Sequence, residues 1–396
     1  MTRVPDAALL ADPGLRLVWA ALPDARVVGG AVRDRLLGVP VADIDLATPQ
    51  PPAAVMAALL AAGLGAKPTG IAHGTVTAVA LGKGYQVTTL RRDVATDGRR
   101  AVVAFTDDWQ ADAARRDFTM NALSMDRSGR VFDYWEGLAD LRAGRVRFVG
   151  DAVARIAEDY LRVLRFFRFY ARFGRVAPDF ATESALRAGA NGVPGLSGER
   201  VRHELLGLLA VPDPRAAVAL MDRLDVLAAV LPDGVSWPRF VRLLDAGAPA
   251  DPLLRLAALA SGDVASLAAR LRLSVPERRL LAALRVPSEP ADADPGALRR
   301  ALAELDPLLP VSVLTDRAWL ADDGTSNWAA LRARLAVLER PVFPLAGRDA
   351  RRLGVPAGPE LGRLLGAVRA WWLAGGCVAD RAACLMRLAE STHAAR

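Results

Sequence analysis

The sequence that decides the fold is Gly29-Gly30-Ala31-Val32-Arg33-Asp34-Arg35-Leu36-Leu37-Gly38, followed after four residues by Asp43-Ile44-Asp45-Leu46-Ala47. If residues 44–47 form a strand, successive side chains point to opposite faces. Asp43 and Asp45 then share one face, while Ile44 and Leu46 enter the core. The stretch therefore predicts a strand that presents two neighbouring carboxylates to the same side.

Two carboxylates side by side repel each other unless a cation lies between them. A hard divalent ion with oxygen ligands, above all Mg²⁺ with part of its water shell, meets this need and would hold a phosphate-bearing substrate nearby. Gly29-Gly30 predicts a turn whose bare backbone can approach a triphosphate. Residues 31–37 predict a helix whose first N–H groups, together with Arg33, are directed at anionic oxygens.

Length and composition limit the class of protein. A chain of 396 residues can form two or more domains, and Lys and Arg exceed Asp and Glu by 51 − 44 = 7. The excess of arginine favours phosphate or nucleic-acid partners, although the same composition is typical of a GC-rich genome. Two cysteines and three histidines are too few for a disulfide framework or a zinc cluster. Without a membrane or targeting segment, a cytoplasmic location is expected.

The first 150 residues combine short β-type runs with helices. Strands are predicted at residues 27–28, 44–47, 75–81, 86–90 and 131–134, with a hairpin turn at Gly82-Lys83-Gly84-Tyr85 and helices at 51–63 and 110–123. Residues 93–108 have weak periodicity and predict a mobile loop beside the site. From about residue 151 onward, runs of Leu, Ala and Arg at helical spacing predict an all-helical remainder.

Arg115-Arg116-Asp117 is the second group of interest, on the helix predicted at 110–123. If Phe118 and Ala122 point inward, Arg116 faces the cleft, where a guanidinium can bind a phosphate through paired hydrogen bonds. The alternative is an ordinary surface cluster of charged residues.

The third group lies in Glu158-Asp159-Tyr160-Leu161-Arg162-Val163-Leu164-Arg165-Phe166-Phe167-Arg168 and the residues that follow. Asp159 and Arg162 fall on one predicted helix line with Phe166, Phe169 and Phe173. They are either a simple ion pair or a pair that binds a ligand. A parallel cationic line, which suits a triphosphate or an RNA backbone but also an exposed surface, contains Arg165, Arg168 and Arg172.

A carboxylate next to a guanidinium can select nucleotide bases. The carboxylate accepts from an exocyclic amine, and the guanidinium donates to a ring nitrogen that has a lone pair. Cytosine and adenine offer both groups, whereas uracil and guanine offer neither in that arrangement. Because a good bidentate contact is worth ~1–3 kcal/mol of discrimination, Asp159 and Arg162 would select C and A.

Three strings, Gly29 to Asp45, Arg115 to Leu123 and Glu158 to Arg168, resemble the head and neck motifs of one family. They are similar to those of the bacterial-type CCA-adding tRNA nucleotidyltransferases and the related bacterial poly(A) polymerases, within the polymerase β-like superfamily. The resemblance implies an α+β nucleotidyltransferase head with a small mixed, mostly antiparallel sheet at 1–150. It also implies a helical neck for base recognition at 151–210 and a helical body and tail that bind tRNA at 211–396.

The resemblance also implies roles for individual residues. They are the metal-binding catalytic carboxylates Asp43 and Asp45, the nucleotide-phosphate contacts Gly30, Arg33 and Arg116, the base-recognising pair Asp159 and Arg162, and further nucleotide contacts at Arg165 and Arg168. One departure is Gln86, which stands where relatives commonly have Glu before Val-Thr-Thr. On that strand this chain therefore offers an amide where the resemblance implies a third carboxylate.

The expected activity is template-independent addition of C, C and A to the 3′ end of tRNA from CTP and ATP, with Mg²⁺ and release of pyrophosphate. The alternatives are a poly(A) polymerase, a partial enzyme that adds only CC or only A, and a catalytically silent RNA-binding protein. The intact Asp43, Asp45 and Arg33 count against the last of these. The sequence does not predict the oligomeric state.

Overall fold

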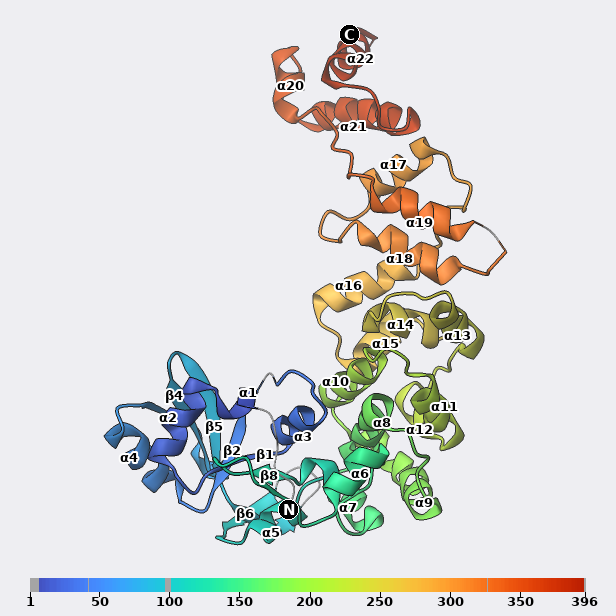
Figure 1. Cartoon of the computed structure of the whole chain (residues 1–396). Coiled ribbons are helices and arrows are strands. Elements are labelled where there is room, and N and C mark those ends of the chain that lie inside the picture. The colour runs from blue at the N-terminus through green and yellow to red at the C-terminus, as the bar shows by residue number, and fades with distance from the viewer. Residues whose placement is uncertain (1–6, 42, 97–100, 326, 395–396) are drawn as a thin grey trace. The chain divides into compact units, whose positions relative to one another are not determined.

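The computed structural model describes residues 7–41, 43–96, 101–325 and 327–394. The chain divides into two compact units, Met1–Pro232 (unit 1) and Asp233–Arg396 (unit 2). Unit 1 contains the strands and the first helices, whereas the named elements of unit 2 are helices (Figure 1). This confirms the predicted fold class, an α+β head followed by helices. The domain boundaries predicted at residues 150 and 210 stay predictions.

A mixed sheet forms the centre of the head. Its strands, in spatial order, are β3 (Gly65–Gly70), β4 (Thr75–Ala80), β5 (Lys83–Thr89), β2 (Asp45–Thr48), β1 (Arg26–Val28), β8 (Ser124–Met125) and β9 (Val131–Phe132). Among these strands, β2 and β5 pair in parallel and the other pairs are antiparallel. Between β2 and β5 the chain forms a helix and then strands β3 and β4, which is long enough for a parallel connection. A separate two-stranded sheet consists of β6 (Arg91–Thr96) and β7 (Ala101–Phe105).

The acidic pair lies at the start of strand β2, with Asp45 as its first residue and Asp43 two residues before it. Ile44 and Leu46 are buried, while Asp43 and Asp45 are exposed, so the predicted alternation is confirmed. In the parallel pairing with β5, Asp45 lies opposite Gln86. The start of β2 therefore holds both carboxylates outside the core.

The helices of unit 1 complete the head and continue beyond it. They are α1 (Ala7–Leu10), α2 (Pro13–Ala21), α3 (Gly30–Leu36), α4 (Pro52–Ala61), α5 (Trp109–Ala114), α6 (Gly137–Ala143), α7 (Ala152–Glu158), α8 (Leu161–Phe173), α9 (Phe180–Gly189), α10 (Gly198–Leu209), α11 (Arg215–Arg223) and α12 (Val226–Val230). Three 3-10 turns lie at η1 (Ile71–His73), η2 (Thr119–Asn121) and η3 (Ala190–Gly195). Helices α2 and α4 pack on the sheet, and α10 and α11 pack on α8.

A buried aromatic cluster joins the head to α8. Phe118 lies 5.0 Å from Phe148 and 5.3 Å from Phe169 between ring centroids, and Phe148 stacks on Phe166 at 5.8 Å. All four rings are buried. Because aromatic rings at these separations attract each other beyond their burial, the cluster fixes α8 beside the head.

The helix predicted at 110–123 is wrong in its second half. Helix α5 ends at Ala114, and Phe118 is extended, with φ −121° and ψ 148°. The Asp117 carboxylate accepts the N–H of Phe118 at 2.8 Å, and Phe118 forms an isolated antiparallel bridge with Phe148. The hydrogen bond from the Phe118 N–H to the Asp117 side chain, together with burial of Phe118 in the aromatic cluster, favours an extended backbone over a helix at this position.

The β-structure is more extensive than predicted. Residues 91–96 and 101–105 pair as strands where a loop was expected over 93–108, and residues 97–100 of that loop lie outside the described ranges. The hairpin turn is Leu81-Gly82, both with positive φ, so β5 resumes at Lys83 rather than after residue 85. Strand β3 was not predicted because it contains Pro68. A strand at the edge of a sheet tolerates proline, and β3 lies at the edge.

Unit 2 is a succession of helices. They are α13 (Trp237–Asp245), α14 (Pro252–Leu259), α15 (Val264–Leu271), α16 (Val275–Leu284), α17 (Pro295–Glu304), α18 (Ser312–Ala321), α19 (Trp328–Ala336), α20 (Gly347–Arg352), α21 (Pro359–Ala374) and α22 (Arg381–Ala394). Its apolar side chains form several small clusters, such as the one around Leu331 and the one around Trp372. No helix in the described ranges is both long and apolar enough to cross a membrane.

Candidate active site

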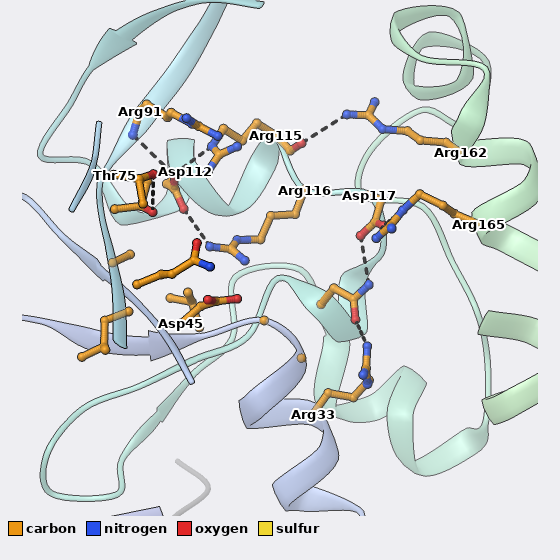
Figure 2. Close-up of a pocket in the computed structure, with 18 of the residues that line it drawn as sticks. Arg33, Asp45, Thr75, Arg91, Asp112, Arg115, Arg116, Asp117, Arg162 and Arg165 are labelled. Carbon is orange, nitrogen blue, oxygen red and sulfur yellow. Dashed lines mark hydrogen bonds and ion pairs between the residues drawn. The ribbon is translucent and has the colours of Figure 1, made fainter. Parts of the chain in front are cut away.

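A pocket of about 620 Å³ opens in unit 1 between the head sheet and α8 (Figure 2). Every predicted site residue except Asp43 lines it, namely Gly30, Arg33, Asp45, Arg116, Asp159, Arg162, Arg165 and Arg168. The structure therefore brings together groups that are more than 100 residues apart in sequence. Asp43 lies two residues before Asp45, exposed beside the pocket.

The acidic pair is electrostatically strained. Loss of hydration around the Asp45 carboxylate, and then repulsion from Asp43, raise the pKa of Asp45 above its usual 3.8, whereas Arg116 lowers it. A cation placed between the two carboxylates would relieve this repulsion. Gln86, opposite Asp45 on β5, also lines the pocket and adds an uncharged amide rather than a third carboxylate.

The first glycine of the pair, Gly29, is required at the start of α3. Gly29 has φ +68°, a conformation that disfavours other residues, and a Cβ there would lie 3.0 Å from Nη1 of Arg116. Arg33, one turn into the helix, is 5% exposed and donates to the Asn121 side-chain oxygen at 2.5 Å and to Asp34 at 2.8 Å. Burial lowers the pKa of Arg33 despite Asp34. The guanidinium is thus held rigidly in the pocket wall.

Asp112, on α5, lines the pocket and was missed in the sequence. It is 3% exposed, accepts Nε of Arg115 at 2.9 Å and Nη2 of Arg116 at 3.2 Å, and also accepts the N–H of Arg91 (Figure 2). Burial alone would raise the pKa of Asp112, but the two arginines hold it below its ordinary value. The spacing of three and four residues to the arginines was the available sequence signal.

Arg165 and Arg168, on α8, are held by two acids, Asp117 and Glu204. Arg165 donates twice to the Asp117 carboxylate, at 2.8 and 2.5 Å, and Asp117 also accepts from Asn121 at 3.0 Å (Figure 2). Burial would raise the pKa of Asp117, but Arg165 and the hydrogen bonds lower it. Glu204 of α10, 3% exposed, lies 3.6 Å from Arg165 and 3.3 Å from Arg168. Asn121 thus links Arg33 to the Asp117–Arg165 pair.

The predicted helix line through Asp159 is wrong. Helix α7 ends at Glu158, and Asp159 is extended, with φ −160° and ψ 106°, before α8 begins at Leu161. Nor do Asp159 and Arg162 pair with each other among the described contacts. Asp159 pairs with Arg200 at 2.6 Å, and Arg162 pairs with Glu158 at 2.5 Å. The described contacts therefore do not show the first of the two alternatives, a simple ion pair between them.

The arrangement suits an anionic ligand with a metal ion. Arginines from α3, from the turn after α5 and from α8 line a cavity that Asp45 also lines, with Asp43 exposed two residues before it. Such a site can bind a chain of phosphates and stabilise the charge that develops in phosphoryl or nucleotidyl transfer. Across the described residues, no group of three or more His, Cys, Asp or Glu side chains could hold a metal ion by itself.

Comparison with known protein families gives two matches. The first lies in unit 1, and the second extends four residues beyond its end at Pro232. Residues 25–147 match the Poly A polymerase head domain, and residues 177–236 match a domain described as the probable RNA and SrmB-binding site of polymerase A. The first match contains the acidic pair, the glycine turn and Arg116. Members of this nucleotidyltransferase family generally depend on a metal ion.

Individual relatives extend the likeness over most of the chain. The human protein named CCA tRNA nucleotidyltransferase 1, mitochondrial, is 36% identical over 370 residues, covering 89% of this chain and 83% of its own length. The CCA-adding enzyme of Geobacillus stearothermophilus is 41% identical over 202 residues, covering 50% of this chain and 48% of its own. The crystal structure of the Bacillus stearothermophilus CCA-adding enzyme in complex with CTP superposes with a TM-score of 0.73 at 27% identity, covering 97% of this chain and 99% of that one. The geometry of the pocket and this likeness along nearly the whole chain agree, and the protein belongs to the family of CCA tRNA nucleotidyltransferases.

Proposed function

We propose that the pocket of unit 1 is where this chain, as a CCA tRNA nucleotidyltransferase, transfers nucleotides from CTP and ATP to the 3′ end of tRNA. The observation that carries the proposal is the pair Asp43 and Asp45 at the edge of a cavity lined with arginines. Relatives support the substrates: one solved structure is a complex with CTP, and a Thermotoga maritima CCA-adding enzyme was solved in complex with tRNA.

Mg²⁺ is the proposed metal, held by Asp43 and Asp45. The raised pKa of Asp45 supports this, because repulsion from Asp43 contributes to it and a cation would remove that repulsion. Mg²⁺ is usually bound by one or two carboxylates, with water and substrate phosphates as its other ligands. When bound, it would favour ionisation of the attacking hydroxyl and neutralise charge on the phosphates.

The phosphates are assigned to Gly30, Arg33 and Arg116. All three line the same pocket as Asp45, and Arg116 is close enough to lower the pKa of that carboxyl. Because Asp112 and Asn121 hold the two guanidinium groups in place, little side-chain entropy is lost when a triphosphate binds.

The base is assigned to Asp159 and Arg162, with further nucleotide contacts from Arg165 and Arg168. Asp159 would accept the exocyclic amine of cytosine or adenine, and Arg162 would donate to the neighbouring ring nitrogen. The separate partners of these two side chains support this assignment, because neither neutralises the other.

In the proposed reaction the 3′ oxygen of tRNA bonds to the α-phosphorus while the bond from that phosphorus to the β-phosphate oxygen breaks. The hydroxyl proton leaves to solvent, and pyrophosphate carries away the electron pair of the broken bond. Residues of the pocket hold the triphosphate in line, and their fixed positive charges stabilise the transition state.

The carboxylates are tested by Asp43→Asn and Asp45→Asn, which keep shape and remove charge. Incorporation of labelled CTP into tRNA lacking its 3′ CCA should fall by more than about a hundred-fold in both, because metal-assisted charge stabilisation supplies several kcal/mol. Asp24→Asn, at an exposed aspartate in the turn between α2 and β1, is the matched control and should retain activity. Full activity in either test variant would remove the proposal.

The rival activity is addition of AMP alone to RNA ends, suggested by the family to which residues 25–147 match. Supplying CTP alone to a tRNA that lacks CCA separates the two. Addition of two C residues supports CCA addition, and no addition of C supports the rival. The cytoplasmic location expected from the sequence stays a prediction, since the human relative is named as mitochondrial.

A further inference from the structure

Asp159 is fixed by two donors that do not belong to the pocket wall. Its Oδ1 accepts the N–H of Leu161 at 3.1 Å, and its Oδ2 accepts Nη2 of Arg200 at 2.6 Å. Asp159 lines the pocket, whereas Leu161 and Arg200 are not among the described residues that do. A carboxylate has about four lone-pair sites, so the two that are engaged leave two for a ligand.

Arg162 is also fixed, by one carboxylate and two backbone carbonyls. Its Nη1 donates to Glu158 at 2.5 Å and to the Arg155 carbonyl at 2.7 Å, and its Nη2 makes a long contact of 3.4 Å to the Arg115 carbonyl. A guanidinium has five N–H donors, so at least two remain for a ligand. Both members of the pair are therefore oriented and still able to bind.

The separation of Asp159 from Arg162 depends on Arg200. Asp159 lies three residues before Arg162, and its charge also acts on Arg165. Without the Arg200 guanidinium, which is 30% exposed and comes from the first turn of α10, the carboxylate would be drawn to these two cations. A direct Asp159–Arg162 bond would consume the acceptor and the donor that a base needs.

We infer that Arg200 is a positioning residue for nucleotide selection: it holds the Asp159 carboxylate away from Arg162, so that both stay free for the base. It acts through Asp159 and touches no reacting atom. The inference rests on the proposed function of Asp159 and Arg162 in base recognition, and adds a residue on another helix that sets their geometry.

The experiment measures kcat/KM for CTP and for UTP on tRNA lacking CCA, with the full chain. Arg200→Met should lower the CTP-to-UTP ratio by about ten-fold, the lower part of the range for one good base contact. Inhibition by inorganic tripolyphosphate, a probe of phosphate binding alone, should change less than two-fold. Arg200→Lys, which keeps the charge, should recover most of the ratio, whereas loss of packing alone would not depend on charge.

A double-mutant comparison separates positioning from general damage. If Arg200 acts through Asp159, Arg200→Met in an Asp159→Ala background should leave the CTP-to-UTP ratio of the single Asp159→Ala variant unchanged. The matched control is Arg187→Met, which breaks another Arg–Asp pair of unit 1, at 2.8 Å and outside the pocket, and should keep the wild-type ratio.

The outcomes distinguish the inference from the function on which it rests. If Asp159→Ala lowers the ratio and Arg200→Met does not, the inference is wrong and base recognition by Asp159 stands. If Asp159→Ala keeps the wild-type ratio, the proposed base recognition itself fails. Should Arg200→Met not fold, Arg200→Gln, which removes the charge and keeps a donor, takes its place, and an unchanged ratio there overturns the inference.

Discussion

Replacing Asp112 by alanine should damage both stability and nucleotide binding. The carboxylate is almost fully buried and accepts three hydrogen bonds, two of them from Arg115 and Arg116, whose side chains are only 20% and 19% exposed. Removing one partner of a buried ion pair costs ~3–5 kcal/mol, and we expect the lower end, about 3, because all three residues line the pocket. For a unit of this size, that corresponds to a fall in melting temperature of roughly 6–12 °C.

The effect on binding follows from the same contacts. Once Asp112 is gone, two arginine side chains must be ordered when the nucleotide binds, at ~0.5–1.5 kcal/mol each, so KM for CTP should rise roughly ten-fold. Asp112→Asn, which keeps one acceptor oxygen, should show about half of each effect in free energy. The assays are thermal unfolding followed by circular dichroism and steady-state incorporation of CTP.

Asp108→Ala provides the control for Asp112. Asp108 caps the same helix, α5, by accepting the N–H of Gln110, but none of its described bonds goes to an arginine. Loss of this cap should cost ~1 kcal/mol of stability and leave KM unchanged. If Asp112→Ala instead keeps the melting temperature and KM within error of the wild type, the buried carboxylate does not hold the arginines.

Three further perturbations test other features. Gly137→Ala would place a Cβ 2.2 Å from the carbonyl oxygen of Thr119, so unfolding in urea should show a loss of ~1–3 kcal/mol, while Gly195→Ala, at a site with open space, should show none. Gln86→Glu puts a carboxylate opposite Asp45. Mn²⁺, titrated without nucleotide, should then bind several-fold more tightly than to the wild type, and an unchanged affinity would contradict this. Burial, and next a nearby aspartate, raise the pKa of Asp316 to about 6, so the folded state binds more protons and loses stability as pH rises from 3.8 through 6. Asp316→Asn should therefore stabilise the chain at pH 7.5 and have little effect at pH 4, and equal effects at both would refute it.

Local pattern was sufficient for several elements. The alternation around Ile44 and the Pro51-Pro52 helix start are decided by neighbouring residues, and both are confirmed in the structure. Elements that depend on distant partners were predicted less well. The paired strands β6 and β7 lack periodicity, and Pro68 in β3 is tolerated only because that strand lies at the sheet edge.

The site shows the same division. Gly30, Arg33 and Arg116 were predicted because their residue types and spacing indicate phosphate binding. The structure places them in one pocket, and their role there stays a prediction. Asp112 and Glu204 were missed, because a buried acid that holds an arginine has no distinctive sequence pattern unless its partner is known.

The sequence by itself determined the chemistry available to this protein: a carboxylate pair after a strand, a glycine turn before a helix, and arginines at helical spacing. These are short-range features, and alternation or helical period follows from backbone geometry alone. Only the tertiary structure decided which charges pair. Asp159 and Arg162 are near neighbours in sequence, yet the end of α7 and the packing of α10 against α8 give each a different partner. Coulombic attraction acts through space, so the folded arrangement, and not the order of residues, sets which groups remain available to a substrate.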